Sequence, residues 1–129
     1  MLSATPVIEV YYASSCAPCR LELPTLAELV RTDGAIVRIV IVDEEVRALR
    51  EIRDVSPVLA RHAIVAQPGK PNDTLRAAGD SDGILPYARV LSPSGVACAQ
   101  WRGQMTLFRA RALVEECVRR LTSRHPQRS

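Results

Sequence analysis

Two apolar runs flank an amphipathic segment in the first third of the chain. Residues 7–12 are mostly β-branched or aromatic, which is typical of a buried strand, and residues 35–42 repeat this pattern. Between the two runs, apolar residues recur at helical spacing up to the Asp33-Gly34 turn. These positions are Leu21, Leu23, Leu26, Leu29 and Val30. A strand, a helix and a second strand in this order predict a βαβ unit with parallel strands.

The middle of the chain predicts short helices joined by loops. Residues 44–53 place apolar side chains on one helical stripe, and Ser56-Pro57 interrupts this helix. Residues 58–67 are ambiguous, with a short strand over residues 63–65 as one interpretation. A short helix is expected over residues 72–78, with Gly79 as its C-terminal stop.

The last third predicts a β-hairpin followed by a helix. Residues 84–91 and 95–101 are strand-like, and the turn-forming sequence Ser92-Pro93-Ser94-Gly95 separates them. Thr106 is placed to cap a helix with apolar residues at helical spacing. These residues are Ala110, Leu113, Val114, Cys117 and Leu121. The complete order predicts an α/β fold, a small mixed β-sheet with helices on both faces.

Composition adds limits to this picture. With 129 residues, 47% of them hydrophobic, the chain fits one globular domain over residues 1–122 and a flexible tail over 123–129. No apolar run approaches the roughly 20 residues of a membrane-spanning helix. The net charge of +3 comes without a basic stripe, which argues against nucleic-acid binding. The first residues lack the basic start of a secretory signal, so a cytoplasmic location is expected if Met1 is the native start.

Cys16 and Cys19 form a Cys-x-x-Cys motif at the junction between the first predicted strand and helix. A helix N-terminus offers unpaired N–H groups and a partial positive charge, and both favour a thiolate over a thiol. This placement indicates redox chemistry with Cys16 as the nucleophile. The alternatives are two small buried hydrophobic residues, or a module that binds a partner or delivers a metal without catalysis.

Cys98 and Cys117 are interpreted separately from this pair. Cys98 lies in the last predicted strand and Cys117 on the apolar stripe of the final helix, so we expect buried structural cysteines. A second disulfide or a regulatory thiol is the alternative. Their distance in sequence disfavours zinc, because structural zinc sites pair two closely spaced ligand couples, and no metal or other cofactor is predicted.

The motif and its surroundings resemble the thioredoxin superfamily. Residues 12–20 read Tyr-Ala-Ser-Ser-Cys-Ala-Pro-Cys-Arg and look like the family's aromatic-Ala-x-Trp-Cys-Gly-Pro-Cys-Lys/Arg segment. Leu85-Pro86 precedes the predicted hairpin as the family's cis-proline does, and Gly103 falls where a glycine ends its last strand. Arg20-x-Glu22-x-Pro24, which includes the helix-kinking proline, is most similar to the TlpA and ResA type of thiol-disulfide oxidoreductase.

The resemblance implies a thioredoxin-like fold and an enzyme that reduces disulfides by dithiol exchange. Cys16 attacks the substrate disulfide and Cys19 resolves the mixed disulfide. Pro86, in cis, leaves the backbone of Leu85 free to pair with an extended substrate. The residues expected to support the site are Tyr12, Ser15, Ala17 and Pro18.

The resemblance also implies partners and a direction. The partners are a protein or small-molecule disulfide and an upstream thiol reductant, with the protein acting as a monomer. The Ala17-Pro18 pair is closer to the reducing Gly-Pro of thioredoxin than to the Pro-His of strong oxidants. The similarity to envelope-type oxidoreductases adds the bacterial periplasm as the alternative location.

Three departures from the family pattern concern the site and the sheet. Ser15 stands where the family has tryptophan, and Val10 stands where thioredoxin has a buried aspartate, so the proton relay to Cys19 must differ. Glu9 is adjacent, but strand alternation directs its side chain to the opposite face. The family's usual first strand and helix have no room before residue 7, which leaves two alternatives: a minimal version of the domain, or an upstream segment that was removed.

Overall fold

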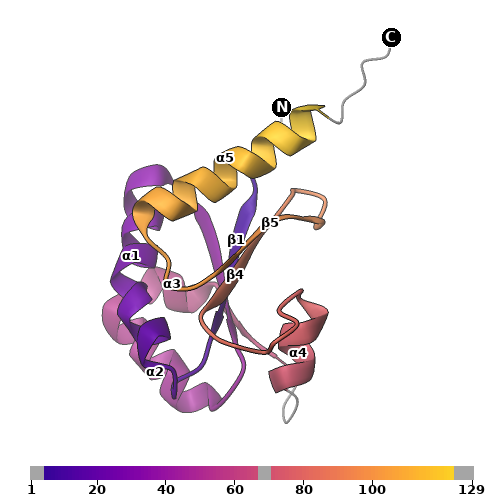
Figure 1. Ribbon diagram of the computed structural model, residues 1–129. Coiled ribbons are helices and arrows are strands. Elements are labelled where there is room, and N and C mark those ends of the chain that lie inside the picture. The colour runs from indigo at the N-terminus through magenta and orange to yellow at the C-terminus, as the bar shows by residue number, and fades with distance from the viewer. Residues whose placement is uncertain (1–4, 67–70, 124–129) are drawn as a thin grey trace.

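The computed structural model describes residues 5–66 and 71–123 (Figure 1). The strands are β1 (Val7–Tyr12), β2 (Ile36–Ile41), β3 (Ala63–Val65), β4 (Tyr87–Leu91) and β5 (Ala97–Arg102). The helices are α1 (Ala17–Asp33), α2 (Glu45–Val55), α3 (Pro57–Arg61), α4 (Pro71–Ala77) and α5 (Leu107–Ser123).

The strands form one mixed five-stranded sheet in the order β3-β2-β1-β4-β5. β2 pairs with β1 and β3 in parallel, whereas β4 pairs antiparallel with β1 and β5. This arrangement confirms both the βαβ unit and the hairpin. Residues 63–65, which the sequence leaves ambiguous, form the outer strand next to β2.

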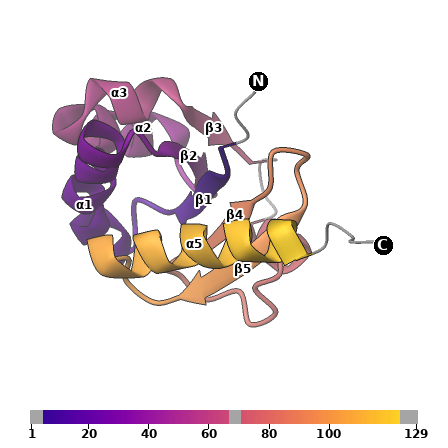
Figure 2. The ribbon, with the colours of Figure 1, turned by 90° about the horizontal axis from the view of Figure 1, so that it is seen from above.

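Helices cover both faces of the sheet, as predicted. α1, α2, α3 and α5 contribute to the larger hydrophobic core, which packs on the face that carries Ile8, Val10 and Tyr12 of β1. α4 lies on the other side, over a smaller cluster that includes Tyr11 and Tyr87 (Figures 1 and 2). Alternate residues of β1 therefore serve two cores, because successive side chains of a strand point to opposite faces.

Local signals explain where the elements begin and end. Gly34 ends α1 in the left-handed conformation (φ 64°) and its N–H donates to the carbonyl oxygen of Leu29, which is the usual glycine stop of a helix. Ser56 starts α3, since its hydroxyl accepts a hydrogen bond from the N–H of Leu59 at 3.2 Å. Ser56-Pro57 thus separates two helices, as the proline predicts. Thr106 caps α5 through the N–H of Arg109 at 3.0 Å.

Some predicted boundaries were wrong. β4 begins at Tyr87 rather than at residue 84, because Pro86 has no N–H to donate to a neighbouring strand. β5 begins at Ala97, after a turn closed by a 2.7 Å bond from the N–H of Ser92 to the carbonyl oxygen of Val96. Ser123, expected in the tail, is the last residue of α5, and residues 124–129 lie outside the described part. No helix in the described residues is long and apolar enough to cross a membrane.

Candidate active site

Cys16 and Cys19 lie where β1 leads into α1 and are joined by a disulfide, with their Cα atoms 5.2 Å apart. Cys19 is 1% exposed, whereas Cys16 is partly exposed. A substrate can therefore reach Cys16 first. Ala17 and Pro18 are exposed in the first turn of α1 and add no bulk between the two sulfurs.

The N-terminus of α1 is capped by Cys16 itself. Its Sγ accepts a hydrogen bond from the backbone N–H of Cys19 at 3.2 Å. The two serines before Cys16 bond elsewhere: the Ser14 hydroxyl donates to Glu51, and the N–H of Ser15 donates to Asp43. A sulfur that already accepts an N–H bond at a helix N-terminus is well placed to carry negative charge.

Leu85 and Pro86 lie at the same end of the sheet as the dithiol. Tyr87 of β4 is paired with Tyr11 of β1, so the residues before Tyr87 lie beside those that follow Tyr11. The Leu85–Pro86 peptide bond is cis, and the carbonyl oxygen of Pro86 accepts a hydrogen bond from the N–H of Gly103 at 3.0 Å. Leu85 and Cys16 both pack against the two hydrophobic clusters. The structure thus brings the cis-proline segment and the motif to one end of the molecule.

The two tyrosines that end β1 serve different faces. Tyr12 is buried in the same core cluster as Cys19, and its hydroxyl donates to Glu51 at 2.6 Å. Tyr11 is buried in the smaller cluster and donates to Glu9 at 2.6 Å. Burial and the bond to Glu51 raise the pKa of Tyr12 above its usual range. Tyr12 is therefore a neutral donor behind the motif.

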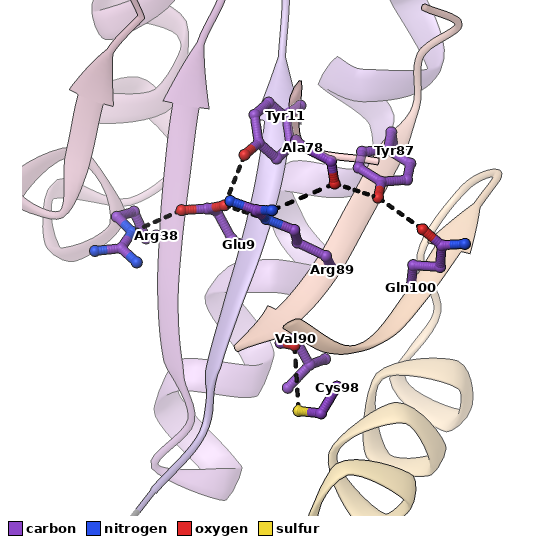
Figure 3. A network of polar contacts seen from close by, with 9 residues as sticks. All are labelled: Glu9, Tyr11, Arg38, Ala78, Tyr87, Arg89, Val90, Cys98 and Gln100. Atoms are coloured by element: carbon purple, nitrogen blue, oxygen red, sulfur yellow. Dashed lines mark hydrogen bonds and ion pairs between the residues drawn. The ribbon is translucent and has the colours of Figure 1, made fainter. Parts of the chain in front are cut away.

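The opposite face of the sheet holds the Glu9 carboxylate between two arginines (Figure 3). Arg38 donates to Glu9 at 3.2 Å and Arg89 at 2.7 Å. Burial raises the pKa of Glu9, but the bonds from Tyr11 and Arg89 and the charge of Arg38 outweigh it, so the pKa lies below its usual value. Strand alternation thus predicted the side of Glu9 correctly. Because Glu9 faces away from the core that holds Cys19, it does not replace the aspartate that thioredoxin carries at the position of Val10.

Glu22 is a buried carboxyl on α1, one helical turn after Cys19, and sequence reasoning gave it no role. Its Oε2 accepts a hydrogen bond from the N–H of Met105 at 2.6 Å. Burial raises the pKa of Glu22 to about 7, and this hydrogen bond opposes the shift only in part. A signal was present, because Glu22 precedes Leu29 by seven residues and so shares its apolar helix face.

Replacing Glu22 by Gln is expected to remove a pH dependence of folding stability. The unfolded carboxyl ionises near pH 4.5, whereas the folded one stays protonated up to about pH 7. The folded protein therefore loses stability as pH rises through this window, by about 3 kcal/mol. Glu22→Gln cannot ionise but keeps an oxygen acceptor for Met105. Urea unfolding measured from about pH 4 to pH 8 checks this.

The exposed Glu45, which lies in the first turn of α2, provides the matched control. Glu45→Gln should follow the wild-type stability curve across the same pH range. A Glu22→Gln curve that also runs parallel to the wild type would contradict the assignment of a raised pKa to Glu22.

Cys98 and Cys117 were expected to be buried structural cysteines, with a second disulfide or a regulatory thiol as the alternative. They are buried, as expected, but they form a second disulfide, with Cα atoms 5.0 Å apart, between β5 and α5. Cys98 Sγ lies 3.2 Å from the carbonyl oxygen of Val90 on the neighbouring strand (Figure 3). The alternative of a second disulfide therefore holds.

Known structures place this arrangement among related folds, although no protein-family model and no curated protein sequence matches the chain. A thioredoxin-related protein from Neisseria meningitidis serogroup B superposes with a TM-score of 0.71 at 18% identity, over 92% of this chain and 88% of that one. MTB DsbF, in mixed oxidized and reduced forms, gives 0.68 at 18% identity, over 88% and 81%. A secreted thiol-disulfide isomerase from Corynebacterium glutamicum gives 0.60 at 20% identity, over 89% and 71%. The chain therefore has the thioredoxin fold.

Proposed function

We propose that the protein is a thiol-disulfide oxidoreductase that reduces disulfides through Cys16 and Cys19. One observation carries this proposal: a partly exposed Cys16 is bonded to a buried Cys19, and its sulfur accepts an N–H bond at the N-terminus of α1. A thiolate held there is both stabilised and accessible, which is what disulfide exchange needs. Similar folds that are named thiol-disulfide isomerase or oxidoreductase support this chemistry.

The reaction runs in two exchange steps from the reduced protein. The Cys16 thiolate attacks one sulfur of the substrate disulfide, and the other substrate sulfur leaves as a thiolate. The Cys19 thiolate then attacks Cys16 Sγ, releases the second substrate thiol and forms the Cys16–Cys19 disulfide. The substrate gains two electrons and the protein loses two, which an upstream thiol reductant restores.

Neighbouring residues are assigned supporting roles in this proposal. The backbone of Leu85 next to Pro86 receives an extended substrate segment, and Ser15 leaves an open surface where the family has tryptophan. Glu22 is a buried acid one helical turn after Cys19, and burial raises its pKa to about 7.

We also propose a setting for the reaction. The site residues named here belong to one chain, so a monomer suffices. A second, buried disulfide is typical of proteins that fold in an oxidising compartment, which favours the bacterial periplasm over the cytoplasm. There the protein would need a dedicated thiol reductant to act as a reductase.

Trapping the mixed disulfide tests the proposal. Cys19→Ser removes the resolving thiol, so the reduced variant should accumulate a covalent adduct with a protein disulfide such as insulin. Non-reducing electrophoresis would show the adduct, and mass spectrometry should map it to Cys16. Cys16→Ser/Cys19→Ser is the matched control and should give none. An adduct absent from Cys19→Ser, or located on Cys98 or Cys117, would contradict the assignment.

A further inference from the structure

Ser14 lies in the loop between β1 and α1, two residues before Cys16, and is only 2% exposed. Its backbone N–H donates to Asp43 Oδ1 at 2.9 Å, and its hydroxyl donates to Glu51 Oε2 at 2.8 Å. Its carbonyl oxygen accepts a hydrogen bond from the guanidinium of Arg20. Every polar group of this buried residue is therefore bonded, which fixes the loop in one conformation.

The same two carboxylates also hold the residues on either side of Ser14. Asp43 Oδ2 accepts the N–H of Ser15 at 3.2 Å, and Glu51 Oε1 accepts the Tyr12 hydroxyl at 2.6 Å. Asp43 follows β2, and Glu51 lies on α2, so both belong to elements outside the segment that carries the motif. We use the term loop clamp for four residues, Ser14, Arg20, Asp43 and Glu51.

The clamp matters most in the reduced protein. In the oxidised protein the covalent bond between the two cysteines keeps Cys16 against α1. Once that bond is reduced, the Cys16 sulfur stays on the N–H of Cys19 only if the loop that leads to it is held by other contacts. The clamp supplies contacts of this kind. Three hydrogen bonds join Ser14 to the other clamp residues, and one joins the N–H of Ser15 to Asp43.

We propose that Asp43 and Glu51 are positioning residues of the dithiol, which hold the reduced Cys16 sulfur at the N-terminus of α1 and thereby set its reactivity. This inference rests on the proposed function, because it concerns the same nucleophile. It gives α2 a part in the reaction although no residue of α2 belongs to the motif.

Charge and position act in opposite directions here, which makes the proposal testable. A carboxylate near a thiolate disfavours it by like-charge repulsion, so loss of charge alone lowers the pKa of the thiol. Loss of the clamp releases the sulfur from the helix N-terminus and raises that pKa. One substitution that removes a clamp carboxylate therefore shifts the pKa of Cys16 up if position dominates and down if charge dominates.

Glu51→Ala is the principal variant. It removes the acceptor of both the Tyr12 and the Ser14 hydroxyls. We expect the pKa of Cys16, measured from the pH dependence of iodoacetamide alkylation of the reduced protein, to rise by about one unit. At pH values where most of the thiol is protonated, a rise of one pKa unit lowers the fraction of thiolate about tenfold. The alkylation rate should fall only about threefold, because a more basic thiolate is also more nucleophilic.

Matched variants separate the two causes. Glu51→Gln loses the charge but keeps groups that can bond both hydroxyls. Its Cys16 pKa should therefore lie much closer to the wild-type value than the Cys16 pKa of Glu51→Ala does. Asp43→Asn and Asp43→Ala lose the same charge, but the asparagine keeps one of the two acceptor oxygens and the alanine keeps none. The pKa of Cys16 should therefore rise more in Asp43→Ala than in Asp43→Asn. Glu45→Ala, exposed on the same helix, should match the wild type.

The outcomes are decisive because alkylation needs no disulfide substrate. A wild-type protein that is alkylated at Cys16 but reduces no disulfide would contradict the proposed function. The effect of the clamp on the pKa of Cys16 could still be measured in that case. An unchanged or lowered pKa in Glu51→Ala, or equal shifts in Glu51→Ala and Glu51→Gln, would overturn the clamp alone. If Glu51→Ala does not fold, Ser14→Ala decides: it removes one hydroxyl and no charge, and an unchanged pKa there overturns the proposal.

Discussion

Cys16→Ser is expected to abolish catalysis of disulfide reduction, bringing the rate of insulin reduction by dithiothreitol down to the uncatalysed background. A serine hydroxyl is not ionised near neutral pH, so it needs a neighbouring base to become a nucleophile. The N–H of Cys19, which stabilises a thiolate in the native protein, cannot supply that activation. The loss of the catalysed rate should therefore be complete.

The control for this experiment must add a serine without touching the dithiol. Ala97→Ser does so, since Ala97 is exposed at the start of β5. It should keep the wild-type rate, and circular dichroism should show that Cys16→Ser is folded. Residual turnover in Cys16→Ser above that of a Cys16→Ser/Cys19→Ser variant would instead show that Cys19 can act as nucleophile despite its burial.

The sequence was informative about this site because its signals are local. A strand pattern, a Cys-x-x-Cys motif and a helix pattern follow one another within residues 7–33, and a helix N-terminus favours a thiolate whatever surrounds it. The side of Glu9 followed from strand alternation for the same reason. The first strand, the helix that follows it and the side of Glu9 were thus predicted correctly.

The residues that hydrogen-bond the loop before the motif could not be predicted from the sequence, because they are distant from it along the chain. Asp43 and Glu51 are 29 and 37 residues from Ser14, and a serine before a helix is usually read as its cap. The fold instead gives the cap to Cys16 and directs the Ser14 hydroxyl toward α2. No pattern within residues 12–20 distinguishes these two outcomes.

Short and exposed elements were the other source of ambiguity. β3 has three residues and lies at the edge of the sheet, with Ile64 and Val65 both exposed, so it lacks the alternation of a half-buried strand. Its pairing with β2 comes from the tertiary fold and not from its own sequence. The pairing of Cys98 with Cys117 is similar, because a helix stripe and a strand pattern indicate burial but not which two buried residues meet.

Removing this second disulfide is expected to cost the protein much of its stability while leaving the dithiol intact. Cys98→Ala/Cys117→Ala frees a segment of about 20 residues in the unfolded chain, which by chain entropy lowers the free energy of unfolding by about 3 kcal/mol. Urea unfolding of the oxidised proteins measures this. Val118→Ala, exposed on α5 next to Cys117, should change stability by less than about 0.5 kcal/mol.

The same variant separates the roles of the two disulfides. Cys117 is fully buried and Cys98 is 8% exposed, so a reductant reaches the partly exposed Cys16 more readily than either of them. Mild dithiothreitol treatment followed by alkylation should therefore label Cys16 and Cys19 before Cys98 and Cys117. Cys98→Ala/Cys117→Ala should retain insulin reduction at temperatures where it stays folded. Loss of activity in the folded variant would contradict the assignment of a purely structural role to the disulfide between β5 and α5.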